Sequence, residues 1–193
     1  MRARTTLFAV MLLFCVPTVF GQNLLTNGSF ETGDFTGWTT GGNFEFTQVV
    51  SGSFYAYSGA QDGQYYAALG PVGGDGTLSQ SFNDLAGSLY DFSFWLAAVG
   101  DSPSDFGVYW NGSQVLSLTD PNTGGVWQSF NFVVEGTGHD TITFAFRDDP
   151  EYIALDNIST VGCCGTVPEP SSLVLMGTGV IGLGVMARRR LHR

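Results

Sequence analysis

Few residues in this chain have the types and spacing that catalysis requires. The chain has two histidines, His139 in a glycine-rich turn and His192 close to the C-terminus. His139 precedes Asp140, but adjacent residues on a turn or strand do not normally face one another. No serine or cysteine nucleophile motif accompanies them. We therefore predict that His139 is an exposed turn residue rather than a catalytic base.

A group of acidic residues is the other candidate for chemistry. Asp148, Asp149 and Glu151 flank Pro150, and paired carboxylates can hydrolyse glycosides. Their spacing is more typical of a surface hairpin, so we expect a solvated acidic loop that could bind a cation weakly. Phosphate chemistry also lacks support, because no glycine-rich loop is followed by a lysine. The sequence therefore predicts a protein that is not an enzyme.

Exposed aromatic rings could bind a ligand, because sugar rings stack against them. Tyr109 and Trp110 are neighbours in a strand-like run, so they point to opposite faces and only one can lie in the core. The other is either a platform for a sugar or an ordinary exposed aromatic, and the abundance of aromatic residues favours the ordinary role. The full set of candidates for carbohydrate binding is Tyr55, Tyr57, Tyr109, Trp110 and Trp127.

The charge of the chain excludes several partners. Its net charge is -10, and all seven basic residues are arginines. Six of them lie near the two ends, which leaves Arg147 in the central part. Such a domain repels nucleic acid and anionic lipid. Its carboxylates lack counter-charges, which favours cations such as Ca²⁺ as partners, although acidity alone would also keep an exported protein soluble.

Two terminal segments are expected to be sorting signals rather than parts of the folded domain. Residues 1–21 combine Arg2 and Arg4 with an apolar run and a small residue at Gly21, which is typical of a secretory signal peptide. Residues 171–187 are apolar and uncharged, near the shortest length that spans a bilayer as a helix. The expected organisation is a signal peptide at 1–21, one domain at 22–165 and a tail at 166–193.

The central domain is expected to form strands almost throughout. Asn111-Gly112 between two apolar runs is a strong signal for a two-residue hairpin. Apolar residues alternate in two of the runs: Ile142, Phe144 and Phe146, and Phe130, Phe132 and Val134. Many short strands without an amphipathic helix predict an all-β fold, a jelly-roll β-sandwich. The expected strands are Phe44–Val50, Gln64–Leu69, Thr77–Phe82, Leu89–Ala98, Phe106–Trp110, Gln114–Leu118, Trp127–Val134, Thr141–Arg147 and Tyr152–Val161.

The C-terminal tail resembles the PEP-CTERM sorting signal of Gram-negative bacteria. Its three parts stand in the same order: Val167-Pro168-Glu169-Pro170, the apolar span, and Arg188-Arg189-Arg190. Arginines after such a span keep that end in the cytoplasm. The resemblance implies processing by an exosortase, a membrane transpeptidase or protease, near the Pro-Glu-Pro sequence. It also implies a link to exopolysaccharide, whereas the alternative is a plain C-terminal membrane helix.

The central domain resembles the galactose-binding-like jelly rolls, which include several carbohydrate-binding modules. The resemblance rests on the opening Asn27-Gly28-Ser29-Phe30-Glu31 and on Asp156 in the closing run. It implies a structural Ca²⁺ with Glu31 and Asp156 as carboxylate ligands and main-chain carbonyls near Asn27 and Gly28. The alternative is that Glu31 and Asp156 pin the two ends of the domain through hydrogen bonds, without metal.

Together these features predict an exported surface or matrix protein that is not an enzyme and that associates with exopolysaccharide. We expect an inner-membrane precursor, held by its tail, which then reaches the cell surface or the extracellular space. A carbohydrate-binding module with a defined glycan ligand is the alternative, and a glycan hydrolase is a less favoured one. The adjacent Cys163 and Cys164 leave the state of the pair open.

Overall fold

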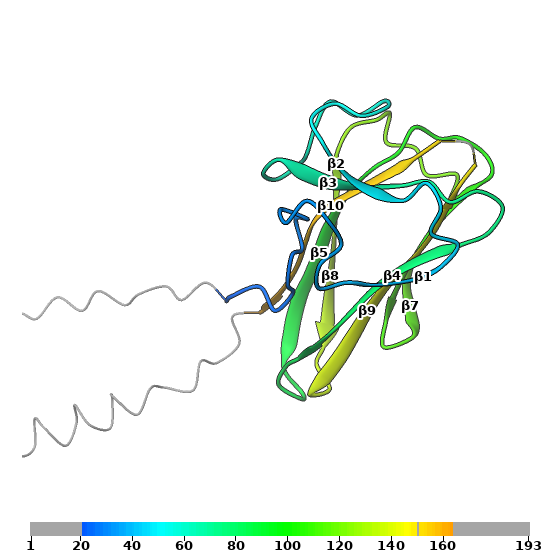
Figure 1. Ribbon diagram of the computed structural model, residues 1–193. Coiled ribbons are helices and arrows are strands. Elements are labelled where there is room, and N and C mark those ends of the chain that lie inside the picture. Colours follow the sequence, from blue (N-terminus) through cyan, green and yellow to red (C-terminus); the bar gives the residue numbers. More distant parts are fainter. Residues whose placement is uncertain (1–20, 150, 164–193) are drawn as a thin grey trace, which may run out of the picture.

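The computed structural model describes residues 21–149 and 151–163, which form a sandwich of two five-stranded antiparallel sheets (Figure 1). One sheet has the strand order β1-β4-β9-β6-β7, and the other has the order β2-β3-β10-β5-β8. These described residues contain no helix. The ten strands are β1 (Thr39–Gly42), β2 (Gln48–Ser51), β3 (Tyr65–Leu69), β4 (Gly76–Asn83), β5 (Leu89–Ala97), β6 (Ser104–Trp110), β7 (Ser113–Thr119), β8 (Gln128–Glu135), β9 (His139–Asp148) and β10 (Ile153–Gly162).

The chain crosses repeatedly from one sheet to the other. Strands β4, β6 and β9 lie in the first sheet, whereas β5, β8 and β10 lie in the second. A chain that alternates between two antiparallel sheets in this way is typical of a jelly roll. The predicted all-β jelly-roll sandwich is confirmed.

Aromatic side chains fill the space between the two sheets. Every second residue of β9 is buried, and Phe144 lies at the centre of the cluster. The centroid of its ring is 6.3 Å from that of Phe92, 5.4 Å from that of Phe94 and 5.8 Å from that of Phe106. Burying each such side chain stabilises the fold by about 2 kcal/mol. The alternation in the sequence therefore predicted the inward face of β9 correctly.

The start of the domain departs from the predicted strands. The first expected strand, Phe44–Val50, is reduced to the four residues of β2. Phe44 packs against the core, and Phe46 adopts a φ of 56° and is exposed, so the chain turns before β2 begins. The sequence did not predict β1, because Thr-Thr-Gly-Gly has no apolar alternation. This strand exists because it pairs along the edge of β4.

The predicted hairpin between β6 and β7 is confirmed. Asn111 and Gly112 have φ angles of 50° and 77°. Both values lie in the left-handed region that a two-residue turn of type I′ requires. Tyr109 and Trp110 precede this turn on β6. Both residues pair with β7 on one side of the strand and with β9 on the other.

A smaller apolar cluster lies on the outer face of the second sheet, beneath the loop that joins β2 to β3. Tyr57 from this loop packs with Tyr66, Ala97 and Ala154 from the sheet. Trp127 closes the cluster, with its ring centroid 5.7 Å from that of Tyr66. This cluster holds the β2–β3 loop, which Figure 1 shows in cyan at the top of the molecule, close against the sandwich.

The two ends of the described chain lie side by side, away from the β2–β3 loop (Figure 1). The N–H of Leu24 donates to the carbonyl of Thr160 over 2.9 Å, so the first residues run along the end of β10. Strand β10 begins at Ile153, next to the β9–β10 loop, and ends at Gly162. Its ten residues span about 30 Å, which is the distance between that loop and the C-terminal end of the described chain. The expected signal peptide, sorting motif and membrane span lie outside the described residues, except for Gly21.

Candidate functional site

The two carboxylates expected to bind Ca²⁺ both contact the end of the β2–β3 loop. Asp156 Oδ2 accepts hydrogen bonds from the N–H groups of Gln61 and Asp62, over 2.8 and 3.0 Å. Glu31 Oε1 accepts from the N–H groups of Gln64 and Tyr65, each over 2.8 Å. The prediction that these two carboxylates lie in one region was correct. The shared partner that the structure shows for them is the main chain of this loop.

The other two residues expected near the metal are used in the fold. The carbonyl oxygen of Asn27 accepts from the indole N–H of Trp38 over 3.0 Å. The carbonyl of Gly28 accepts from the N–H of Ile158 over 2.9 Å. A Cβ atom at Gly28 would lie 2.0 Å from the carbonyl oxygen of Ile158, so only glycine permits the opening segment to approach β10 this closely.

Main-chain N–H groups of the β2–β3 region thus bind both carboxylates. Burial raises the pKa of Asp156 to about 7, although three main-chain N–H groups oppose the shift. Within residues 21–149 and 151–163, no three His, Cys, Asp or Glu side chains form a group that could hold a metal ion. A structural Ca²⁺ at Glu31 and Asp156 stays a prediction.

The expected aromatic candidates separate into buried and accessible rings. Trp110 is 7% exposed, and its ring packs against those of Phe82 and Phe92. The prediction that Trp110 could serve as a platform for a sugar was wrong, because both faces of its ring lie in the core. Tyr57 is 2% exposed and is excluded for the same reason.

Two of the remaining aromatic residues are only partly accessible. Trp127 is half-buried, and its indole N–H donates to the carbonyl of Gly59 over 3.0 Å. Tyr109 lies on the outer face of β6, with its ring over Gly107, as the alternation with buried Trp110 requires. Neither residue lines the hollow that is described next.

Tyr55 is an accessible aromatic residue that lies in a hollow with acidic neighbours. Its side chain is 57% exposed and lines an open hollow of about 520 Å³. The other lining residues are Ala56 from the same loop, Val99 and Asp101 from the β5–β6 loop, and Glu151 from the β9–β10 loop. Three loops that are distant in the sequence thus meet at the end of the sandwich opposite to the chain ends.

Local contacts fix the β2–β3 loop at this hollow. Phe54 and Tyr57 exchange two main-chain hydrogen bonds of 3.1 and 3.0 Å, and Tyr55 between them adopts a φ of 54°. This left-handed conformation is strained for an aromatic residue. The ring of Tyr152 supports the loop from below, with its centroid 5.0 Å from Phe54 and 5.8 Å from Tyr55.

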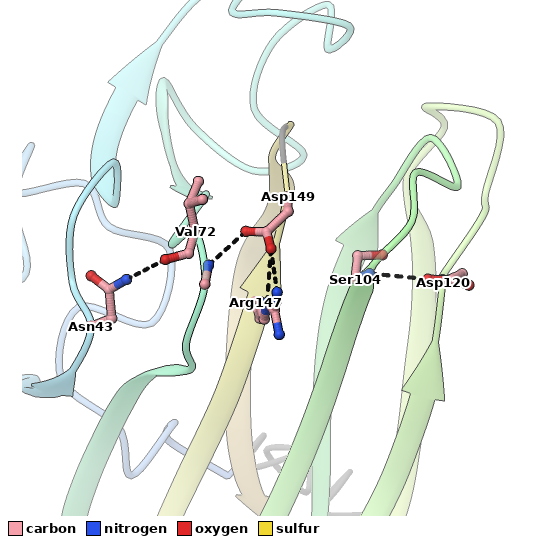
Figure 2. Close-up of polar contacts among 7 residues, drawn as sticks. Asn43, Val72, Ser104, Asp120, Arg147 and Asp149 are labelled. Carbon is pink, nitrogen blue, oxygen red and sulfur yellow. Dashed lines mark hydrogen bonds and ion pairs between the residues drawn. The ribbon is translucent and has the colours of Figure 1, made fainter.

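The β5–β6 loop is fixed by its own contacts. Gly100 has a φ of 86°, and a Cβ atom there would lie 2.3 Å from the side chain of Asn122. Asp101 follows, and its carbonyl accepts from the hydroxyl of Ser104 over 2.8 Å. Figure 2 shows that the N–H of Ser104 in turn donates to the carboxylate of Asp120, over 3.0 Å. The carboxylate of Asp101 is therefore carried by a tightly bonded turn.

The three acids around position 150 do not form one solvated loop, so that prediction was wrong. Figure 2 shows Asp149 in an ion pair with Arg147, while its other oxygen accepts from the N–H of Gly73 over 2.9 Å. Asp148 points to the interior and is 3% exposed. Glu151 alone of the three lines the hollow. The strand alternation of β9 separates these side chains.

The hollow is strongly acidic. The carboxyl groups of Asp101 and Glu151 lie within hydrogen-bonding reach of each other, which raises the pKa of Asp101. A hydrogen bond to Glu151 raises the pKa of the Tyr55 phenol to about 12. Beneath them, burial and the charges of Asp101 and Glu151 raise the pKa of Asp148 to about 7. Sequence analysis missed Asp101, which lies 50 residues before Glu151 and belongs to no motif in the sequence.

His139 and Asp140 do not form a catalytic pair. His139 is exposed, and its Nδ1 lies 3.0 Å from the side-chain oxygen of Asn83. Asp140 is fully buried and accepts from the side-chain amide of Asn111 over 2.6 Å. The two side chains of this dipeptide lie on opposite faces of β9, as the sequence analysis predicted.

The fold and the sorting motif are those of known proteins. Residues 166–190 match the family model described as the PEP-CTERM protein-sorting motif, which marks an exported protein. Among solved structures, the chain resembles the carbohydrate-binding module TmCBM61 in complex with beta-1,4-galactotriose, with a TM-score of 0.59 and 20% identity over 74% of this chain and 99% of that chain. The central domain therefore has the jelly-roll fold of carbohydrate-binding modules.

Two further structures share the fold. The enzymatically active domain of tailspike protein 4 from bacteriophage CBA120 gives a TM-score of 0.54 and 17% identity over 73% of this chain and 21% of that chain. The K3 cleaved adhesin domain of Lys-gingipain from Porphyromonas gingivalis gives 0.50 and 14% over 69% and 97%. No curated protein sequence matches the chain.

The structure does not test the expected membrane span. Among the described residues, no helix has the length and apolar character needed to cross a membrane. The span predicted at residues 171–187 lies beyond them.

Proposed function

We propose that this protein is an exosortase-sorted surface protein whose jelly roll binds a neutral glycan in the hollow around Tyr55. The observation that carries the proposal is the exposed ring of Tyr55 beside the carboxyl groups of Asp101 and Glu151. Aromatic faces stack on sugar rings, and carboxylates accept hydrogen bonds from sugar hydroxyls. The fold of carbohydrate-binding modules supports this assignment.

The charge of the hollow defines the class of glycan. Asp101, Asp148 and Glu151 place three acids in or directly beneath it, and the whole chain has a net charge of -10. Uronic-acid or sulfated glycans would be repelled at such a site. A neutral glycan brings the hydroxyl donors that these carboxylates need without adding negative charge.

The position of the hollow suits a surface protein. It lies about 30 Å along β10 from the point where the chain leaves towards its sorting tail. A signal peptide would direct export, the tail would hold the precursor in the inner membrane, and an exosortase would process it near Pro168. The hollow would then face away from the cell, where exopolysaccharide is available.

Binding rather than hydrolysis fits the carboxyl geometry. Glycosidases separate their two catalytic carboxyl groups by about 5 to 10 Å so that the bond or a water fits between them. Asp101 and Glu151 instead lie within hydrogen-bonding reach of each other. This arrangement supports a non-enzymatic role, with a glycan hydrolase as the alternative that an activity assay tests.

A glycan array tests the proposal. We expect the purified protein to retain neutral oligosaccharides, and beta-1,4-galactotriose is the first one to try because the similar module was solved with it. Retention of uronic-acid glycans alone would contradict the proposal. Bound oligosaccharides should be recovered at their original length, and shortened products would replace the binding role with hydrolysis.

A further inference from the structure

Three turns are bonded to one another at the end of the sandwich where the described chain ends. The N–H of Asp84, in the β4–β5 loop, donates to the carbonyl of Gly138 in the β8–β9 turn over 3.3 Å. The N–H of Asn111, in the β6–β7 turn, donates to the carbonyl of Thr141 on β9 over 2.9 Å. The β4–β5 loop leads into Leu89, whose carbonyl accepts from the N–H of the last described residue over 2.9 Å.

Two carboxyl groups lie between these turns. Asp140 is fully buried and accepts from the side-chain amide of Asn111 over 2.6 Å. It also accepts from the N–H of Thr137, over 3.1 Å, and from the Thr137 hydroxyl. Asp84 Oδ1 accepts from the N–H of Gly138 over 2.6 Å. Asp140 thus joins the β6–β7 and β8–β9 turns, while Asp84 joins the β4–β5 loop to the β8–β9 turn.

The second oxygen of Asp84 has no donor in this arrangement. Asp84 Oδ2 is buried and receives no N–H or O–H group from the described residues. A Cβ atom at Gly136 would lie 2.5 Å from it, so glycine is needed where this carboxyl group meets the β8–β9 turn. The carboxyl group of Asp140 lies within hydrogen-bonding reach of that of Asp84. Two neighbouring carboxylates repel each other when both are ionised, and a single proton between them removes that cost.

The surroundings favour one proton on the pair. Burial, followed by the hydrogen bond to Asp140, raises the pKa of Asp84 above its ordinary value of 3.8, against the opposing charge of His139. Burial also disfavours the ionised form of Asp140, but hydrogen bonds from Asp84 and other neighbours together hold the pKa of Asp140 below 3.8. Tyr90 from β5 faces the pair across Gly136. The one arginine or lysine among residues 21–149 and 151–163 is held in an ion pair at the other end of β9.

We propose that Asp84 and Asp140 share one proton, and that the loss of this proton at higher pH frees the β4–β5 loop from the two neighbouring turns. With the proton in place, the protonated carboxyl group of Asp84 donates to the Asp140 carboxylate. When the proton leaves for solvent, two negative charges face each other. Asp84 is the side that separates, because the described residues give its carboxyl group one donor, whereas Asp140 keeps those of both turns.

The sign of the pH dependence follows from the two pKa shifts. Because the pKa of Asp84 is raised in the folded chain, its contribution to stability is fully present below about pH 4 and is lost as the pH rises through the folded pKa. Because the pKa of Asp140 is lowered, its contribution is present above about pH 4 and is lost as the pH falls through its folded pKa. The pair therefore stabilises this end most when it holds one proton.

Hydrogen exchange of the full-length chain in detergent tests the proposal. The reporters are the N–H groups of Gly87, which donates to the carbonyl of Gly136 over 2.8 Å, and of Gly138. Asp84→Asn is the comparison at each pH, because its carboxamide donates to Asp140 at every pH and its oxygen still accepts from Gly138. We expect the ratio of exchange rates, parent over Asp84→Asn, to rise at least fivefold from pH 4 to pH 8.

A matched variant shows whether any lost acid has this effect. Asp91→Asn removes an exposed carboxylate on β5, and its exchange should follow that of the parent at every pH. The raised pKa values of Asp148 and Asp156 act equally on all these proteins and cancel in the ratio. A ratio that does not change with pH, with the parent and Asp84→Asn both folded, would overturn the shared proton.

The two members of the pair should also differ from each other. At pH 8, Asp84→Asn should melt at a higher temperature than the parent, because the new amide supplies the donor that the ionised pair lacks. Asp140→Asn should melt at a lower temperature, or fail to fold, because its amide group meets the donors of Thr137 and Asn111. A melting temperature of Asp84→Asn as low as that of Asp140→Asn would overturn the proposal. The pair lies at the end of the sandwich opposite to the hollow, so neither result depends on glycan binding.

Discussion

The hydroxyl of Tyr57 donates to the main-chain carbonyl of Tyr152 and joins two of the loops that form the hollow. Tyr57 lies on the β2–β3 loop, two residues after Tyr55, and Tyr152 follows Glu151. The contact is buried, since Tyr57 is 2% exposed. The aromatic and acidic sides of the hollow are thereby held at a fixed distance.

Tyr57→Phe should lower the free energy of unfolding by about 1–2 kcal/mol, because the carbonyl of Tyr152 loses its donor in a buried place. Urea denaturation measures the change. Tyr109→Phe, on the outer face of β6, is the matched control and should change stability by less than about 0.5 kcal/mol. Equal effects of the two substitutions would show that the hydrogen bond contributes nothing.

The stability of the domain should depend on pH through Asp148. The pKa of this carboxyl is raised from 3.8 to about 7 in the folded state. The folded chain therefore holds the proton more tightly than the unfolded chain, and stability falls as the pH rises from about 4 through about 7. Asp148→Asn removes this contribution.

The difference between the parent and Asp148→Asn isolates that effect, because the raised pKa of Asp156 acts on both proteins. In EDTA, we expect the variant to be more stable than the parent at pH 8, with the gap closing towards pH 4. Thermal unfolding across this range measures it. A gap that does not vary with pH would refute the role of Asp148.

The burial of Trp110 predicts a large asymmetry between two neighbouring residues. Trp110→Ala should destabilise the fold by about 3–5 kcal/mol, because it opens a cavity between Phe82 and Phe92. Tyr109→Ala removes a ring from the outer face and should cost less than about 1 kcal/mol. Chemical denaturation of both variants measures these changes. A larger effect of Tyr109→Ala would contradict the assignment of Trp110 to the core and Tyr109 to the outer face.

The expected structural Ca²⁺ at Glu31 and Asp156 has its own test. If the ion binds there, Ca²⁺ in large excess over its dissociation constant raises the melting temperature, because it binds only the folded chain. The stabilisation should persist in Asp101→Asn and disappear in Glu31→Gln. An unchanged melting temperature of Asp101→Asn in Ca²⁺ and in EDTA would favour the hydrogen-bonded arrangement without metal.

The sequence predicted the fold well wherever local pattern decides the structure. The alternation around Phe144 gave the inward face of β9, and Asn111-Gly112 gave the β6–β7 turn. Strand β1 has no such pattern, since it owes its existence to pairing with β4. Alternation also separated Tyr109 from Trp110, but it could not say which of the two faces the core.

The site was less predictable, because distant loops form it. Asp101 is distant from Glu151 in the sequence and meets it only through the pairing of β5 with β10 and of β6 with β9. Asp148 is buried because it belongs to the inward-facing set of alternate residues on β9. The sequence analysis had assigned it to an acidic surface hairpin instead. Tyr55 was one aromatic candidate among five until the β2–β3 loop placed it beside these acids.

A calorimetric titration with a neutral oligosaccharide selected from the array tests the central claim most directly. The parent protein and Tyr109→Ala should bind it with the same affinity, whereas Tyr55→Ala should bind at least tenfold more weakly, because the sugar loses the aromatic face on which it stacks. Circular dichroism confirms that both variants are folded. Full affinity in Tyr55→Ala, or a loss confined to Tyr109→Ala, would contradict a glycan site in this hollow.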